Sequence, residues 1–437
     1  SAAAKSANSF LRAIDGGLNP AGTLSAEGAD AMISAAEASG EMRDFKEAVE
    51  WISRAADELR RADKLRIREL PDLSELAFRL HSLEGDIARD GMDYGEAEER
   101  YRQAVSELPA LEDGLVPRGG LAFLRKGQVY LKLAELLGKT DSEEAATDYI
   151  TRALESFSRY EQIIGGRGAE GWLGRGKALR LKGDIMATFD LEGALSAARD
   201  AERHFARAWE LDPSDEAALG RAETLILIGN LMSEDGRSAE EVFSRAGEII
   251  AARAESTGIK ASLIRSRIEL EKARGRAAYL KNNQEVAAEH FGEAIMAYGE
   301  LHELAPELPL SSDLAEIHLA TAVAQRESGE PGDAFDSLLR ASEAFEISAD
   351  RATTDGRKRV LHAAIGVYND LESSGLEEDA FDAALFILEL ASRVGGEEVL
   401  EIGQELLLYW ESQDMPLRQK RKLEEAAAPL KEQWGEF

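Results

Sequence analysis

The stretch AERHFARAWELDP, from Ala201 to Pro213, decides the fold. Ala201, Phe205 and Ala208 are separated by four and three residues, which places them on one stripe of an α-helix. The two alanines leave room for a neighbouring helix on either side of the phenylalanine, so we expect this stripe to be a helix-packing face. Pro213 cannot continue a helix, and it predicts that the helix ends just before it.

The same order of a small, a large apolar and a small residue recurs along the chain at steps of 38 to 55 residues. Its eight instances are Ala48/Ile52/Ala55, Ala97/Tyr101/Ala104, Ala146/Ile150/Ala153, Ala201/Phe205/Ala208, Ala239/Phe243/Ala246, Ala287/Phe291/Ala294, Ala334/Leu338/Ala341 and, least clearly, Ala380/Ala384/Ile387, which keeps the spacing but not the order of sizes. A pattern repeated in this way is typical of an array of helical hairpins, in which each hairpin buries its face against the next.

A second helix, with its own spacing, precedes several of these stripes. Its clearest instances are Phe123, Gly127 and Tyr130; Trp172, Gly176 and Leu179; and Glu271, Gly275 and Ala278. Glycine inside a helix costs about 1 kcal/mol relative to alanine. Its recurrence at one register therefore predicts a contact at which a Cβ atom would clash.

Together the two patterns resemble the tetratricopeptide repeat (TPR) family, whose helices read W-x2-L-G-x2-Y and then A-x3-F, followed by P. The resemblance covers nearly the whole chain and is strongest near residues 90–110 and 170–215. It implies an all-α fold, a right-handed α-solenoid of about eight TPR-like hairpins. Because the steps exceed the ~34 residues of the standard repeat, we expect longer hairpins. We assign residues 1–410 to the solenoid and residues 411–437 to a C-terminal capping helix packed on it, in one continuous domain.

Composition agrees with an all-helical chain and excludes several kinds of function. The 437 residues include only 10 prolines and 6% aromatic residues, and no segment reads as a strand. A net charge of -31 argues against nucleic acid as a partner. With no cysteine, disulfides and thiolate metal sites are excluded. No apolar run reaches the ~18 residues of a membrane span.

The sequence contains no complete catalytic or metal-binding motif. Gly171-x4-Gly176-Lys177 nearly matches a phosphate-binding loop, but Ala178 stands where a hydroxyl is needed and no strand precedes the motif. The six histidines show no metal-binding spacing. We therefore expect no enzyme, no cofactor and no metal.

The TPR resemblance also implies a ligand groove lined by the first helix of each hairpin. In the family, the lining residues lie two before, one after, five after and eight after the Trp-like position. On the three clearest helices these are Leu121, Leu124, Gln128 and Leu131; Glu170, Leu173, Lys177 and Arg180; and Glu269, Lys272, Arg276 and Tyr279. Basic and apolar groups are mixed in these sets, which favours a groove with local positive charge.

Two functions remain open at this point. The first is a non-enzymatic scaffold that binds a protein or peptide partner in the groove. The second is an exported periplasmic or lipid-anchored component of a bacterial transport or envelope system, which could enclose a small ligand. The missing cysteines and a Ser/Ala-rich start without Met favour an extracytoplasmic location slightly over a cytoplasmic one. The sequence does not predict an oligomeric state.

Overall fold

A computed structural model of the chain describes residues 7, 29, 31–36, 45–64, 73–107, 116–140, 142–254, 259–305, 312–347, 353–395, 397–413 and 415–434. Within these ranges all regular structure is helical, and no strand occurs. The helices are α3 (Phe45–Lys64), α4 (Leu73–Asp90), α5 (Tyr94–Glu107), α7 (Val116–Lys139), α8 (Glu143–Ile164), α9 (Ala169–Met186), α10 (Leu191–Leu211), α11 (Asp215–Glu234), α12 (Glu240–Ala251), α13 (Lys260–Leu280), α14 (Gln284–Leu304), α15 (Ser312–Glu327), α16 (Pro331–Ile347), α17 (Thr353–Ser373), α18 (Glu377–Val394), α19 (Glu397–Glu411) and α20 (Leu417–Trp434).

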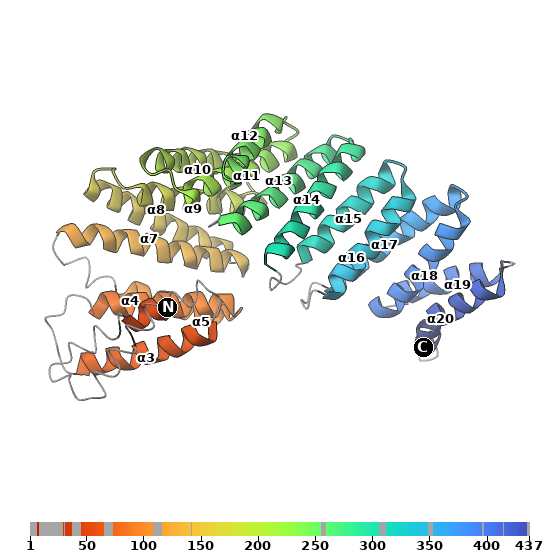
Figure 1. Cartoon of the computed structure of the whole chain (residues 1–437), viewed down its shortest axis with the longest axis horizontal. Helices are drawn as coiled ribbons and strands as arrows, with labels where there is room; N and C mark the ends of the chain where they lie inside the picture. Colours follow the sequence, from red (N-terminus) through yellow and green to blue (C-terminus); the bar gives the residue numbers. More distant parts are fainter. Residues whose placement is uncertain are drawn as a thin grey trace. The chain divides into compact units, whose positions relative to one another are not determined.

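Consecutive helices pack side by side as hairpins (Figure 1). We call the first helix of each hairpin its A helix and the second its B helix. Seven such pairs are complete within the described residues: α4/α5, α7/α8, α9/α10, α11/α12, α13/α14, α15/α16 and α17/α18. Before them, α3 shares an apolar cluster with the helical residues 31–36. The predicted all-α fold of repeated helical hairpins is confirmed.

Contacts divide the chain into two compact units, residues 1–224 and residues 225–437. Helix α11 contributes residues to both. In the second unit, α20 packs on α18 and α19 and buries Leu423, Ala427 and Leu430. The division that we predicted from the sequence, a solenoid to residue 410 and a cap after it, stays a prediction.

The eight stripes that revealed the repeat are all buried. None of their side chains is more than 7% exposed. Each stripe lies on the B helix of its hairpin or, for the first, on α3, and Ala239 is the residue directly before α12. The stripes are therefore the faces by which the hairpins pack, as their spacing predicted.

The recurring glycines of the A helices lie against the aromatic rings of the B helices. The pairs are Gly85 with Tyr101, Gly127 with Phe157, Gly176 with Phe205, Gly229 with Phe243, and Gly275 with Phe291. A Cβ atom added to these glycines would lie 2.2–3.0 Å from the ring, closer than packed carbon atoms approach. The predicted close contacts at Gly127, Gly176 and Gly275 are thus present.

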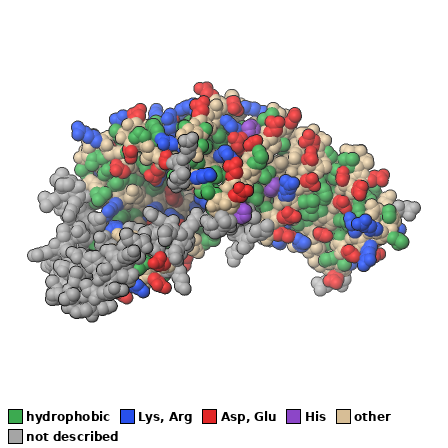
Figure 2. Space-filling view, viewed as in Figure 1, with side chains coloured by type: hydrophobic (Ala, Val, Ile, Leu, Met, Phe, Trp, Pro, Cys, Tyr) green, Lys and Arg blue, Asp and Glu red, His purple; other side chains and the backbone are tan. Residues whose placement is uncertain are grey.

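Acidic and basic side chains are mixed over the visible surface of the helices (Figure 2). Some of them pair one turn apart on the same helix, as Arg102 does with Glu98 at 2.6 Å and Arg152 with Asp148 at 2.8 Å. Such pairs are typical of a solvated helix face. Across the described ranges, no helix combines the length and apolarity needed to cross a bilayer.

Candidate functional site

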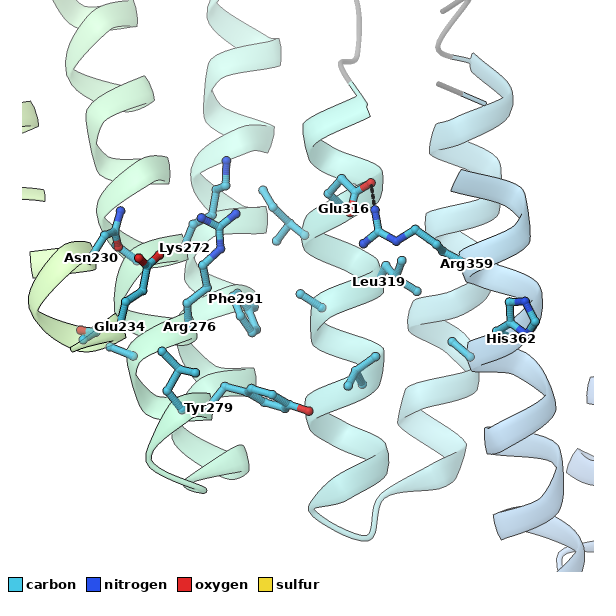
Figure 3. A pocket seen from close by; sticks show the side chains of 18 residues that line it. Asn230, Glu234, Lys272, Arg276, Tyr279, Phe291, Glu316, Leu319, Arg359 and His362 are labelled. Carbon is cyan, nitrogen blue, oxygen red and sulfur yellow. Dashed lines mark hydrogen bonds and ion pairs between the residues drawn. The ribbon is translucent and has the colours of Figure 1, made fainter. Parts of the chain in front are cut away.

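A pocket of about 710 Å³ opens in the second unit across four A helices, α11, α13, α15 and α17 (Figure 3). Polar side chains reach it from every one of them. They are Asn230, Ser233 and Glu234 of α11, Lys272, Arg276 and Tyr279 of α13, Glu316 of α15, and Arg359 and His362 of α17. The pocket therefore collects hydrogen-bonding groups from four successive hairpins.

The floor and walls between these polar groups are apolar. They comprise Ala273, Ala277, Leu280, Phe291, Ile317, Leu319, Ala320, Val323 and Ala363. Phe291 is the ring that packs on Gly275, so the same contact that closes the hairpin also forms part of the pocket floor. A hollow with apolar walls and a few placed polar groups is the usual form of a binding site.

Two cations lie one turn apart on α13. The Lys272 side chain is largely buried, and its Nζ atom lies 2.8 Å from Oε1 of Glu269. The Arg276 guanidinium is exposed toward the pocket. Within the described part of the chain, no carboxylate forms an ion pair with Arg276. Arg276 therefore keeps its donors available for a ligand.

On the far side of the pocket, α17 contributes a second basic group. Nη1 of Arg359 lies 2.6 Å from Oε1 of Glu316 on α15 (Figure 3). His362 follows one turn later and is exposed. Cationic groups thus lie on α13 and on α17, on either side of α15.

Tyr279 closes the α13 side of the pocket through a hydrogen bond to the next A helix. Its hydroxyl donates to Oε1 of Glu327 at 2.7 Å, and Gln284 donates to the other oxygen of that carboxylate at 3.3 Å. The bond to Glu327, followed by burial, raises the pKa of Tyr279. This tyrosine therefore stays protonated and acts as a donor.

Neighbouring A helices are joined by a ladder of side-chain pairs. The pairs are Lys132 with Asp86, Lys177 with Glu216, Arg180 with Glu223, Tyr279 with Glu327, Arg359 with Glu316, and Arg326 with Asp370. Between α13 and residues 225–234 of α11, no such pair occurs among the described side chains. The six pairs above do not join α7 to α9 either. At the step from α11 to α13, Asn230, Glu234 and Arg276 face the pocket.

The first of the three predicted residue sets does not form a common surface. Leu121 and Gln128 are exposed on α7, whereas Leu124 and Leu131 are only 7% and 6% exposed and belong to the hydrophobic core. Buried leucines of this kind cannot touch a ligand without repacking.

The second set lies on α9, where its cations are already paired. Lys177 and Arg180 form ion pairs with Glu216 and Glu223 of α11. Glu170 is exposed and accepts a hydrogen bond from Tyr160 at 3.3 Å. Leu173 is half-buried.

The third set converges on the pocket. Lys272, Arg276 and Tyr279 line it, and Glu269 pairs with Lys272. The structure therefore brings three of the twelve predicted residues into one pocket. Their role in binding stays a prediction.

Sequence reasoning missed Asn230, Arg359 and His362. A signal existed for Asn230, because Gly229 packs on Phe243 as Gly275 packs on Phe291, and Asn230 follows Gly229 as Arg276 follows Gly275. Gly356, whose added Cβ atom would lie 2.6 Å from the Phe345 ring, precedes Arg359 by three residues, as Gly174 precedes Lys177.

The near match to a phosphate-binding loop is explained by helix packing. Residues 171–177 lie inside α9, not in a loop. A Cβ atom on Gly174 would lie 2.4 Å from Phe157, and one on Gly176 would lie 3.0 Å from Phe205. These glycines serve the contact between hairpins.

His204 and His290 have structural partners. Nδ1 of His204 lies 2.7 Å from the backbone oxygen of Asp200, and burial lowers the pKa of this histidine. Nδ1 of His290 lies 2.7 Å from Oε2 of Glu271, and Arg274 donates to the other oxygen of that carboxylate. No cluster of three or more acidic or histidine side chains suited to a metal occurs in the ranges that the structure covers.

No family model matches the chain, and no curated protein matches it. Among solved structures, it is similar to the apo form of the quorum sensor NprR from B. thuringiensis, at 12% identity and a TM-score of 0.48, over 92% of this chain and 99% of that one. A tetratricopeptide repeat protein from Parabacteroides merdae matches at 15% identity and 0.41, over 76% and 98%. BtubC (BKLC) from P. vanneervenii matches at 22% and 0.44, over 58% and 90%. At these identities and TM-scores, the likenesses assign no ligand or partner to this chain.

Proposed function

We propose that this array of TPR-like hairpins is a non-enzymatic scaffold, and that it binds a peptide segment of a partner protein in the pocket across α11, α13, α15 and α17. The observation that carries the proposal is Arg276, whose guanidinium faces an apolar-walled pocket without a carboxylate partner among the described residues. Elsewhere along the A helices, comparable cations such as Lys177 and Arg180 are paired across the ladder. An unpaired cation next to apolar surface offers a ligand both charge and contact area.

A peptide suits the dimensions of the site. The pocket extends over successive A helices, whose axes lie roughly 8–10 Å from their packed neighbours. A chain that crosses it can place successive side chains on α13, α15 and α17, because an extended peptide advances about 3.3 Å per residue. Small side chains at Ala277, Ala320 and Ala363 leave space for such a chain.

The test is a selection of random nonapeptides, displayed between constant flanking segments, on the full chain. We expect peptides to be enriched on the unaltered protein and lost on Ala320→Trp, because an indole at that position fills the pocket. The matched control is Gln128→Trp, which adds the same ring at an exposed A-helix position of the other unit. If no peptide is enriched, or if Ala320→Trp enriches the same peptides, the proposed function is wrong.

A further inference from the structure

The cations of the pocket lie on two of its four helices, and this arrangement bears on which peptide it takes, given the proposed function. Lys272 and Arg276 lie on α13, and Arg359 lies on α17 (Figure 3). Two carboxylates, Glu234 and Glu316, also line the pocket. Glu269 pairs with Lys272 and Glu316 pairs with Arg359, which leaves Arg276 as the one of these three cations without an ion pair among the described residues.

The existing pairs of these cations differ in how open they are to solvent. The Arg359 and Glu316 side chains are 51% and 37% exposed, whereas Lys272 is 11% exposed and its partner Glu269 53%. An ion pair open to solvent on both sides contributes little to stability. An incoming carboxylate can therefore replace Glu316 at Arg359, and at Arg276 it displaces no ion pair among the described residues.

Between the cations of α13 and α17, α15 supplies an apolar strip. Ile317, Leu319, Ala320 and Val323 line the pocket there, and Ala320 and Val323 are partly exposed. A polar side chain placed on this strip would lose water without gaining a partner, which is costly. An apolar side chain placed there would be stabilised by burial.

We infer that the pocket binds an extended peptide segment in which two acidic residues flank an apolar one. One carboxylate binds Arg276 and Lys272, the apolar side chain packs on α15, and the second carboxylate binds Arg359. From the helix spacing and the reach of the side chains, the two acidic residues are roughly four to six positions apart. The recognised groups are internal side chains, so a free chain end is not required.

The experiment uses fluorescein-labelled peptides with acetylated and amidated ends. In one set, two Glu residues flank three to five residues that contain Leu. Matched twins carry Gln in place of both Glu residues, or Ser in place of Leu. Anisotropy titrations with the full chain at 150 mM NaCl measure affinity, because charges farther apart than about 8 Å are largely screened there.

We expect the best Glu peptide to bind at least tenfold more tightly than its Gln twin and its Ser twin. Arg276→Gln and Arg359→Gln should each reduce the advantage over the Gln twin, whereas Lys177→Gln, whose cation is paired on α9, should leave it unchanged. If the Gln twin binds as well as the Glu peptide, or if no member of the set binds while the random selection yields other peptides, this inference is wrong and the proposed function stands. If dodecanedioate, a dicarboxylate without a peptide backbone, binds and the selection yields no peptide, both are wrong.

Discussion

Helices α9 and α13 carry the same register of residues but present different surfaces. Lys177 follows Gly176 on α9 as Arg276 follows Gly275 on α13. Lys177 is paired with Glu216 of the following A helix, whereas Arg276 faces a pocket whose α15 wall includes Ala320 and Val323. The binding capacity of a position in this array therefore depends less on its own side chain than on the side chains of the next A helix.

Three residues later on each helix, at Arg180 and Tyr279, the two surfaces are alike. Arg180 of α9 pairs with Glu223, and Tyr279 of α13 bonds to Glu327. Here both helices meet an acidic residue on their neighbour, so both positions serve to join A helices. Arg276 forms no ion pair among the described residues, although Glu234 of α11 and Glu316 of α15 line the same pocket.

The largest expected effect concerns the glycine contact that the two helices share. Gly275→Ala should lower the free energy of unfolding by about 2–3 kcal/mol, because the new Cβ would lie 2.6 Å from the Phe291 ring. Gly176→Ala should cost less, since its Cβ would lie 3.0 Å from Phe205. Urea unfolding of both variants measures the difference. Gly299→Ala is the control, with no atom within 4 Å of the new Cβ, and it should stabilise α14 by about 0.5–1 kcal/mol. Equal losses at all three glycines would contradict the contact.

A second contrast sets the buried His318 of α15 against the half-buried His204 of α10. Burial, with Arg340 acting in the same direction, lowers the pKa of His318 to about 4. Between pH 7 and pH 5 the unfolded chain takes up a proton at this histidine, whose usual pKa is about 6.5, and the folded chain does not. Stability should therefore fall by about 2 kcal/mol as the pH is lowered to 5.

Urea unfolding of His318→Leu at both pH values checks this loss. The variant should be less sensitive to acid than the unaltered chain. His204→Leu should change the pH dependence less, because the hydrogen bond of His204 to the Asp200 backbone opposes the effect of burial on its pKa. Unaltered acid sensitivity in His318→Leu would show that other groups cause the loss.

A carboxylate added to the α15 wall of the pocket should weaken peptide binding. Ala320→Glu places a carboxylate on the α15 wall, as Glu216 places one opposite Lys177. We expect about tenfold weaker binding of the peptides recovered by selection, or about 1.4 kcal/mol, with little change in stability. Anisotropy and thermal unfolding give the two values. Unchanged binding in Ala320→Glu would show that the unpaired state of Arg276 is not what makes the site.

The smallest effect is expected for the reverse change on α9. Glu216→Gln removes the partner of Lys177, and both side chains are more than a third exposed. Exposed pairs contribute little, so stability should change by less than about 1 kcal/mol. Thermal unfolding measures it. A loss of several kcal/mol would mean that the ladder holds the A helices together.

Helix faces were predictable from the sequence because periodic small and large residues define them directly. The eight stripes and the glycine contacts at Gly127, Gly176 and Gly275 follow from this periodicity. The groove was less predictable. Family offsets give the direction of a side chain around its helix, but not how far the next hairpin covers it, which is why Leu124 and Leu131 are buried.

The pocket itself depends on relations between hairpins. Arg359 and Lys272 are more than eighty residues apart in the sequence and belong to one hollow only because α15 between them carries small and apolar residues. No spacing within one repeat contains that information. The unpaired state of Arg276 likewise depends on where the acids of other helices lie, since Glu316 of α15 pairs with Arg359 instead.

The ring of Phe205 packs between two glycines, Gly176 of its own hairpin and Gly220 of the next A helix. A Cβ atom added to Gly220 would lie 2.3 Å from the ring. Phe157 is held in the same way by Gly127 and Gly174. One side chain thus belongs to two interfaces. A folded hairpin therefore already holds in place the aromatic ring against which the next hairpin packs. Folding should spread from hairpin to hairpin through these rings, and amide hydrogen exchange should show adjacent hairpins of the first unit opening together rather than singly.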